Sequence, residues 1–399
     1  MRAKRSKGGI PLKKRIRSLA ILLSAALLLG CVGCRTNSAD TGSAAQTKPT
    51  TTEEVQNIVD SMSLEDKVAQ LFLVQPEAIV DIGTATAAGD ATKQAINKTP
   101  VGGFVYFSDN LQSEQQVQDM LRNVQKYSED RIGLPAFLSV DEEGGTVARV
   151  ASTGRFDVTD VGDMAKIGAS GDVQQAKQAG ETIGSYLSEL GFNLDFAPDA
   201  DVLTNPDNTV VKKRSFGSDP QVVSDMSLAV AQGLAQHQVH SVYKHFPGHG
   251  ATAGDTHQGY AYTDKTLDEL KQSELIPFEN AIRNNAEFIM AAHISAPRVT
   301  GDDTPASLSK TMITDILRGQ MGYDGIVVTD AMNMGAVTEQ YTSAQAAVKA
   351  LQAGADVVLM PEDFQEAYQG VLDAVKDGTL TEQRINESVT RIVTVKVHM

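Results

Sequence analysis

Eight short apolar runs, separated by longer and more polar stretches, dominate the pattern of the chain after residue 54. They cover residues 68–74, 102–107, 136–140, 192–197, 241–246, 288–292, 325–329 and 355–360. Several of these runs are continuous rather than alternating, as is typical of strands that are buried on both faces of a sheet. We therefore predict eight buried strands.

Helix-like stretches lie between these runs. They include residues 113–128, 172–190, 219–237, 266–284 and 343–353, and residues 381–395 are expected to form the last helix. A strand followed by a helix, repeated eight times, predicts an α/β fold of the (β/α)₈ TIM-barrel type. An open doubly wound sheet would show similar runs, but the number of runs and the length of 399 residues favour the barrel. We expect a single catalytic domain over residues 55–399.

The first thirty residues have the pattern of a secretory signal. Lys and Arg side chains are concentrated before residue 18, and the apolar stretch 19–30 follows them. A positive region, a short apolar region and a small residue at the end are the parts of such a signal. The apolar stretch is also too short for a comfortable membrane span. We expect residues 1–30 to be a signal peptide of the lipoprotein type.

The signal ends in Leu28-Leu29-Gly30-Cys31, which resembles a bacterial lipobox and implies that Cys31 becomes a lipidated N-terminus. The alternative is an ordinary cleaved signal with Cys31 and Cys34 joined in a very small loop, but a bridge that closes so short a loop stabilises little. Cys34 is the weaker lipidation candidate, because Cys31 stands three positions before it. These two cysteines are the only ones in the chain, so we expect neither a disulfide nor thiol chemistry in the folded part.

Residues 31–54 are mostly small and polar, which predicts a flexible tether. Such a tether would hold the folded domain off the outer face of the cell membrane, so we expect an extracytoplasmic, lipid-anchored monomer. The formal net charge is −15, and no basic stripe follows the N-terminal residues. This charge argues against nucleic acid as a partner.

Polar side chains follow five of the apolar runs, where a TIM barrel carries its catalytic residues. They include Asp141, Asp199, His249, His293 and Asp330. Asp330 comes directly after a buried run, and a rigidly held carboxylate is what a retaining glycosidase needs as its nucleophile. The alternative for Asp330 is a carboxylate that caps the turn before the next helix.

Histidines are concentrated between residues 244 and 257. Three of the seven histidines of the chain lie there, together with Asp255. Histidine titrates near neutral pH, and a carboxylate on one ring nitrogen fixes the tautomer and supports the charged ring. Asp255 and His257 are therefore a candidate acid/base pair, in which His257 protonates the leaving oxygen and later activates water.

The same histidines allow a second interpretation, a zinc site formed by His245, His249, Asp255 and His257. The spacing of His245 and His249 would suit one face of a helix. However, Pro247 lies between them and breaks any helix. We therefore expect no metal site.

The run Lys244-His245-Phe246-Pro247-Gly248-His249-Gly250, followed by Asp255-Thr256-His257, strongly resembles glycoside hydrolase family 3 and, more narrowly, its bacterial β-N-acetylglucosaminidase branch. The resemblance covers most of the chain from about residue 55 onward. Further matches are Asp141-Glu142-Glu143-Gly144-Gly145, Asn193-Leu194-Asp195-Phe196-Ala197-Pro198, Arg214-Ser215-Phe216-Gly217 and Pro305-Ala306-Ser307-Leu308-Ser309.

The resemblance implies a role for each matching residue. Asp330 would be the nucleophile, and His257 with Asp255 would be the acid/base dyad. The residues that hold the sugar before the cleaved bond would be Asp141, Arg149, Arg214, Lys244 and His245. Charged groups around a pyranose ring give directional hydrogen bonds. The alternatives are a surface ion pair for Arg149 and packing inside the barrel for Lys244 and His245.

The chain departs from the family pattern at few positions. Thr146 stands where Arg is frequent, and Thr256 and Thr329 stand where Ser is common. Ala331-Met332 follow the expected nucleophile where an acidic and an apolar residue are frequent. Many relatives carry an acid/base Glu on a second domain, which is not expected here and agrees with the histidine branch.

The resemblance implies a retaining exo-β-N-acetylglucosaminidase that works through a covalent glycosyl-Asp intermediate and needs no cofactor. It would hydrolyse terminal β-linked GlcNAc from peptidoglycan-derived fragments, so its partner is a GlcNAc-containing glycan or muropeptide. The alternatives are another β-glycosidase acting on glucose or xylose, a metallohydrolase, and a catalytically silent sugar-binding lipoprotein. The intact Asp330, Asp255 and His257 argue against a silent protein.

Overall fold

The computed structural model describes residues 51–252 and 261–399, and eight parallel strands in them close into a barrel. The strands are β1 Phe72–Val74, β2 Gly103–Tyr106, β3 Phe137–Val140, β6 Leu194–Asp195, β7 His240–Phe246, β9 Phe288–Ala291, β11 Ile326–Thr329 and β12 Val358–Leu359. Each strand pairs with the next one along the chain, and β12 returns to pair with β1. A parallel bridge between Val328 and Val357 joins the two remaining edges.

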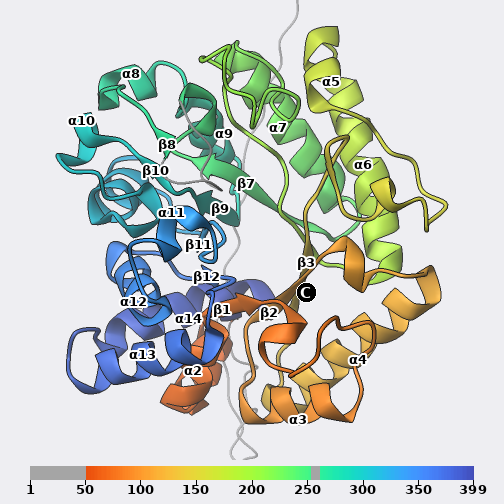
Figure 1. Cartoon of the computed structure of the whole chain (residues 1–399), viewed down its shortest axis with the longest axis vertical. Helices are drawn as coiled ribbons and strands as arrows, with labels where there is room; N and C mark the ends of the chain where they lie inside the picture. The colour runs from red at the N-terminus through yellow and green to blue at the C-terminus, as the bar shows by residue number, and fades with distance from the viewer. Residues whose placement is uncertain (1–50, 253–260) are drawn as a thin grey trace, which may run out of the picture. The chain divides into compact units, whose positions relative to one another are not determined.

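A helix follows each strand and covers the outside of the barrel (Figure 1). These helices are α3 Asp90–Lys98, α4 Glu114–Ile132, α6 Val173–Leu190, α7 Pro220–Ala235, α9 Ile276–Arg283, the π-helix η6 Thr311–Gln320, α12 Ser343–Ala353 and α13 Phe364–Lys376. The helices α1 Thr51–Ser61 and α2 Leu64–Gln70 precede the first strand, and α14 Glu382–Lys396 follows α13. The (β/α)₈ TIM barrel predicted from the sequence is confirmed, and the open doubly wound sheet is wrong.

The first strand begins later than its apolar run. Residues 68–70 complete α2, which starts after Ser63, whose side chain accepts a hydrogen bond from the amide of Asp66. Val68 and Ala69 are apolar because they form the buried face of this helix. A short apolar run does not distinguish a strand from a buried helical turn, and here one run contains both.

Two other boundaries differ from the expectation. The first helix begins at Thr51, a few residues before the expected start of the folded domain. The stretch 266–284 contains two helices, α8 Leu267–Lys271 and α9 Ile276–Arg283, with Pro277 in the first turn of α9. Proline is tolerated in a first turn but breaks a helix interior, so the chain restarts its helix there.

The expected signal peptide, the lipidation candidate Cys31 and most of the expected tether lie outside the described residues. Among the helices of residues 51–252 and 261–399, none is both long and apolar enough to cross a membrane.

Aromatic rings fill the interior of the barrel. The rings of Phe137 on β3 and Phe288 on β9 meet edge to face, with their centroids 5.3 Å apart. Two strands separate β3 from β9 in the sheet, so this contact crosses the barrel interior.

Lys396, at the end of α14, is buried at the opposite face of the barrel. Its Nζ donates hydrogen bonds to the side-chain oxygen of Gln70 at 2.8 Å and to the carbonyl of Gly102 at 2.7 Å, and it lies 4.9 Å from the ring centre of Phe137. These partners are neutral. Burial disfavours the charged ammonium and lowers the pKa of Lys396 from its ordinary 10.5 to about 7.

We expect Lys396→Met to change how stability depends on pH. Between pH 7 and 10.5 the unfolded chain holds a proton that folded Lys396 has released, so this lysine makes the free energy of unfolding rise with pH across that window. Relative to the Met variant, the wild type should gain at most about 1.4 kcal/mol for each pH unit. Chemical denaturation at several pH values measures this difference.

The exposed Lys98 on α3 offers the matched control, and Lys98→Met should leave the pH dependence unchanged. At pH 6 the Lys396→Met variant should be at least as stable as the wild type, because an apolar side chain replaces a buried charge. A difference in stability that stays constant from pH 6 to 10 would contradict the shifted lysine.

Candidate active site

The mouth of the barrel, at the carboxyl ends of the strands, gathers the charged side chains. Asp141 follows β3, Lys244 and His245 lie near the end of β7, and Asp330 follows β11. Because all eight strands are parallel, these ends lie on the same face. The structure therefore places four of the predicted site residues at one mouth.

A small hairpin after β3 brings further charges to the mouth. Strand β4 Glu142–Gly144 turns at Gly145 into β5 Val147–Ala148. Gly145 has a φ of +58°, and a Cβ there would lie 2.4 Å from a carboxylate oxygen of Asp163, so only glycine fits. The amide of Arg149, next to β5, donates to the carbonyl of Asp141 at 3.2 Å.

Lys244 is almost completely buried, with 2% of its surface exposed. Its Nζ lies 2.7 Å from Oδ1 of Asp141 and 2.6 Å from Oε1 of Glu143. Burial opposes the charge, but these two carboxylates outweigh it and raise the pKa of Lys244 above its usual value. Lys244 is therefore a fixed cation in the mouth.

Glu143 also binds Arg214, which lies in the loop between β6 and α7. Both oxygens of Glu143 accept hydrogen bonds from the guanidinium, each at 2.7 Å. Burial would raise the pKa of Glu143, but the charges of Arg214 and Lys244 outweigh it and hold this pKa well below the usual value. A bidentate carboxylate fixes both the position and the plane of the guanidinium.

The ring of His245 is held between a carboxylate and a guanidinium. Nδ1 lies 2.7 Å from Oδ2 of Asp201, and Nε2 lies 3.2 Å from a guanidinium nitrogen of Arg214. A guanidinium only donates, so Nε2 accepts, and Nδ1 carries the proton that it donates to Asp201. Burial would raise the pKa of Asp201, but His245 and the backbone amide of His249 outweigh it and lower this pKa.

Asp330 stands at the end of β11, partly exposed. Its amide donates to the carbonyl of Ala291 at 2.8 Å, and its Oδ1 accepts a hydrogen bond from the amide of Ala331 at 2.8 Å. Burial would raise the pKa of Asp330, but the electrostatic effects of His293, His245 and Lys244, together with the hydrogen bond from the amide of Ala331, outweigh it and lower this pKa. Asp330 is therefore ionised at neutral pH, as a nucleophile must be.

His293 supports the loop that carries Asp330. Its Nε2 lies 2.9 Å from the carbonyl of Ala331, and its Nδ1 lies 2.7 Å from the hydroxyl of Ser307. These two contacts join the loop after β9 to the residue that follows Asp330. His293 thus helps to position Asp330 as well as to lower its pKa.

The predicted sugar-contacting residues differ in how far hydrogen bonds and ion pairs connect them to one another. Asp141, Lys244, Arg214 and His245 form one connected network through Glu143 and direct contacts. Arg149 joins it only through its backbone, while its guanidinium lies 5.4 Å from the ring centre of Phe107. Its Nε is buried without a hydrogen-bond partner among the described residues, so this side chain keeps a donor for a ligand.

The predicted acid/base residues belong to a different segment of the chain. Asp255 and His257 lie outside the described residues, so their role as the acid/base dyad stays a prediction. Asp199 and His293 were predicted only as polar residues at strand ends, and Glu143 only as part of a matching run. The sequence assigned no role to these three residues and did not predict that they are buried. The sequence could have indicated Glu143 through the two cations Lys244 and Arg214, because buried cations require a buried anion nearby.

One group of described residues has the geometry to hold a cation. Asp199, Asp201 and His245 each offer a ligand atom, and these atoms lie within 4.8 Å of one another. However, the guanidinium of Arg214 already lies 3.5 Å from Asp199 and 3.2 Å from His245. Burial and the charge of Asp201 also raise the pKa of Asp199 well above its usual value, which makes Asp199 a poorer metal ligand, because a ligating carboxylate must be deprotonated. The group therefore fits a guanidinium better than a metal ion.

His245 and His249 do not share a helix, as Pro247 between them predicted. His245 lies on β7, whereas His249 begins the short 3₁₀ helix η4 His249–Ala251 beyond Pro247 and Gly248. Nε2 of His249 is buried without a hydrogen-bond partner among the described residues, and its Nδ1 lies 2.9 Å from the hydroxyl of Thr252. The rings of His245 and His249 meet edge to face, with their centroids 5.8 Å apart.

Comparison with known proteins gives a family and several relatives. The model described as "Glycosyl hydrolase family 3 N terminal domain" matches residues 63–395. The chain is 33% identical to "Beta-hexosaminidase LpqI" of Mycobacterium tuberculosis over 95% of this chain and 97% of that protein. It is 32% identical to "Beta-hexosaminidase A" of Pseudoalteromonas piscicida over 77% of this chain and 55% of that protein.

Solved structures give the same picture. A glycoside hydrolase family 3 β-N-acetylglucosaminidase from Paenibacillus sp. superposes with a TM-score of 0.79 and 35% identity, over 84% of this chain and 62% of that one. The structure of M. tuberculosis LpqI superposes with a TM-score of 0.75 and 32% identity, over 86% of this chain and 96% of that one. The chain thus spans little more than half the length of the Pseudoalteromonas and Paenibacillus proteins and nearly all of LpqI.

Proposed function

The chain belongs to glycosyl hydrolase family 3, and from this premise we propose that it is a retaining exo-β-N-acetylglucosaminidase. It would remove terminal β-linked GlcNAc from peptidoglycan-derived glycans or muropeptides. The observation that carries the proposal is Asp330, an ionised carboxylate at the end of a barrel strand, beside a cluster of fixed charges and donors. The relatives named hexosaminidase and N-acetylglucosaminidase support the choice of sugar.

In the first step a carboxylate oxygen of Asp330 attacks the anomeric carbon of the terminal sugar. The bond from that carbon to the glycosidic oxygen breaks, and His257 gives this oxygen its proton. A glycosyl ester of Asp330 remains, and the shortened glycan leaves. The charges that lower the pKa of Asp330 keep it ionised and ready for the attack.

In the second step water attacks the same carbon from the face that the leaving group vacated. His257 takes the proton of this water, the bond to Asp330 breaks, and the sugar leaves with its original anomeric configuration. Each displacement inverts the carbon, so two displacements give retention. Asp255 would orient the ring of His257 and stabilise its charged form.

The buried charge network would hold the sugar for both steps. Asp141 offers a carboxylate acceptor, while Lys244, Arg214 and Arg149 offer donors at the same mouth. Glu143 and Asp201 fix these groups before the substrate arrives. Donors and acceptors that are already in place lose little entropy on binding, which favours the reacting geometry.

A panel of nitrophenyl β-glycosides tests the choice of sugar. We expect the β-GlcNAc compound to be cleaved with a kcat/KM far above those of the β-glucoside and β-xyloside, with β-configured sugar as the first product in proton NMR. Faster cleavage of a glucoside or xyloside would reassign the substrate. No cleavage of any of the three would favour the silent sugar-binding protein.

The location of the protein is a separate proposal, based on residues 19–30 and Cys31. We expect the wild type, expressed in a bacterium, to partition into the detergent phase. Cys31→Ala should partition into the aqueous phase with an unchanged kcat/KM, because Cys31 anchors the chain and takes no part in the chemistry. Cys34→Ala is the matched control and should behave as the wild type. An unmodified mature N-terminus of the wild type in mass spectrometry would refute the anchor.

A further inference from the structure

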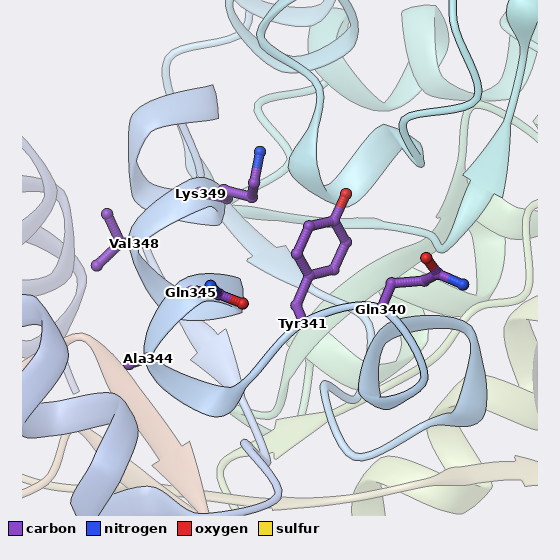
Figure 2. A pocket seen from close by; sticks show the side chains of 6 residues that line it. All are labelled: Gln340, Tyr341, Ala344, Gln345, Val348 and Lys349. Atoms are coloured by element: carbon purple, nitrogen blue, oxygen red, sulfur yellow. The ribbon is translucent and has the colours of Figure 1, made fainter.

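A hollow lies on the outside of the barrel, beside the segment that follows the proposed nucleophile. From Asp330 the chain passes through the short helix α11 Gly335–Thr338 and reaches this hollow at Gln340, just before α12. Figure 2 shows the ring of Tyr341 standing between the side chains of Gln340 and Lys349. The loop belongs to the same set of connections that builds the mouth of the barrel.

The hollow has the size and the mixed lining of a small-molecule site. Its volume is about 450 Å³, and its lining consists of Gln340, Tyr341, Ala344, Gln345, Val348 and Lys349. Small-molecule sites of proteins range from about 300 to 1,000 Å³ and combine apolar surface with a few polar groups. Ala344 and Val348, one turn apart on α12, supply aliphatic surface to the lining.

Some polar groups of the hollow keep hydrogen-bonding capacity that the described residues do not use. Within residues 51–252 and 261–399, the hydroxyl of Tyr341 and the side-chain amide of Gln340 make no hydrogen bond to protein. The side-chain oxygen of Gln345 accepts a hydrogen bond from the backbone amide of Thr342 at 3.1 Å. The side-chain NH₂ group of Gln345 is then the part that can bind a ligand. The ammonium of Lys349 lies 5.3 Å from the ring centre of Tyr341 and forms no ion pair in the same residues.

These groups define the chemistry of the ligand. The amides and the phenol both donate and accept, the ammonium donates, and none of the six lining side chains is acidic in a chain of net charge −15. A sugar ring matches this lining, because its C–H face packs on an aromatic ring while its hydroxyl and acetamido groups exchange hydrogen bonds with amides. We propose that the hollow is a second saccharide site, for a pyranose of the glycan chain away from the bond that is cleaved.

This inference rests on the proposed function and extends it. A glycan that is held at the mouth and also at the hollow would bind more tightly than either contact alone allows, because the second contact forms within one complex. A monosaccharide substrate cannot use both contacts. The hollow should therefore affect long substrates and leave short ones unchanged.

The kinetic test compares Tyr341→Ala with Tyr341→Phe, which keeps the ring. For Tyr341→Ala, the KM for a long GlcNAc oligosaccharide should rise about tenfold, a loss of about 1.4 kcal/mol of binding. The kcat/KM for nitrophenyl β-GlcNAc should stay within about twofold of the wild type. Tyr341→Phe should lie between the two, because the ring remains and the hydroxyl is lost. Equal losses on long and short substrates, or no loss on either, would overturn the site.

A second variant and a binding measurement keep the test decisive. Tyr341 is partly packed against the core, so the exposed Gln340→Ala provides a change that spares the fold, and it should raise the same KM by a smaller factor. Calorimetry with a non-cleavable thio-linked GlcNAc oligosaccharide should show a weak site in the wild type that Tyr341→Ala lacks. If the wild type binds this compound at the hollow but cleaves no GlcNAc glycoside, the proposed function fails and the saccharide site stands. Identical binding by wild type and Tyr341→Ala would refute the site alone.

Discussion

The Asp330→Asn variant is expected to lose roughly 10⁴-fold or more in kcat while keeping its fold. The change removes the nucleophilic charge and leaves the size of the side chain nearly unchanged. The remaining amide can still accept the hydrogen bond that Ala331 donates to this side chain in the wild type. Steady-state kinetics on nitrophenyl β-GlcNAc measure the loss, and thermal unfolding shows that the fold is retained.

Asp109 offers the matched control for this variant. It is exposed in the loop after β2, at the same end of the barrel as Asp330, so Asp109→Asn makes the same chemical change outside the charge network. It should keep wild-type turnover. Near-normal turnover of Asp330→Asn would show that another carboxylate attacks the sugar. Asp141 would then be tested before Asp201, because Asp201 is buried and bound to His245 and His249.

A smaller side chain at this position gives a sharper measurement. In Asp330→Ala, a small anion such as azide can enter the space of the missing carboxylate and attack the anomeric carbon once. A single displacement inverts that carbon, so the product should be the α-glycosyl azide. Rescue by azide with this configuration would identify Asp330 as the nucleophile, and failure of azide to form this product would count against it.

The sequence predicted the fold well because barrel strands are unusual in being buried on both faces. Each of the eight apolar runs coincides with one barrel strand to within a few residues, since most side chains of such a strand face apolar neighbours on both sides of the sheet. The errors lie at the ends of elements. Residues 68–70 carry apolar side chains for a helix rather than for a strand, and Pro277 divides one expected helix into two. Local pattern alone does not separate these cases.

The site was predicted in part, and the reason lies in how its residues are separated along the chain. Asp330, Lys244 and His245 stand at the ends of apolar runs, where charge is conspicuous. Glu143 is one of three consecutive acidic residues, and only the hairpin that follows β3 turns it toward Lys244 and Arg214. That selection depends on the turn geometry at Gly145 and on contacts between distant segments. The hollow at Tyr341 was missed because its residues lie on one loop and one helix face without any recognisable motif.

His257→Ala is expected to separate the two steps of the mechanism. A general acid contributes about 10²- to 10⁴-fold, and it matters most when the leaving group is a poor one. The variant should therefore lose most of its activity on a natural sugar–sugar bond. Formation of the glycosyl-enzyme from a nitrophenyl glycoside should lose much less, because nitrophenolate leaves without a proton. Kinetics on a series of leaving groups of decreasing acidity should show a steep dependence that the wild type lacks.

The second step gives His257→Ala a signature of its own. Without the base for water, the glycosyl-enzyme should accumulate, so a burst of nitrophenol should precede a slow steady state. Asp255→Asn should show a milder form, because the imidazole remains and only its orienting charge is lost. Equal losses on good and poor leaving groups, with no burst, would mean that His257 binds substrate and that the acid/base lies elsewhere.

Azide distinguishes the two catalytic roles by the configuration of the product. In His257→Ala the nucleophile Asp330 is intact, so azide replaces water in the second step and attacks the glycosyl-enzyme without needing a base. The two displacements together retain the configuration, and the product should be the β-glycosyl azide. The same anion should therefore give opposite anomers from Asp330→Ala and from His257→Ala. An α-azide from both variants would remove His257 from the second step, and a β-azide from both would remove Asp330 from the first.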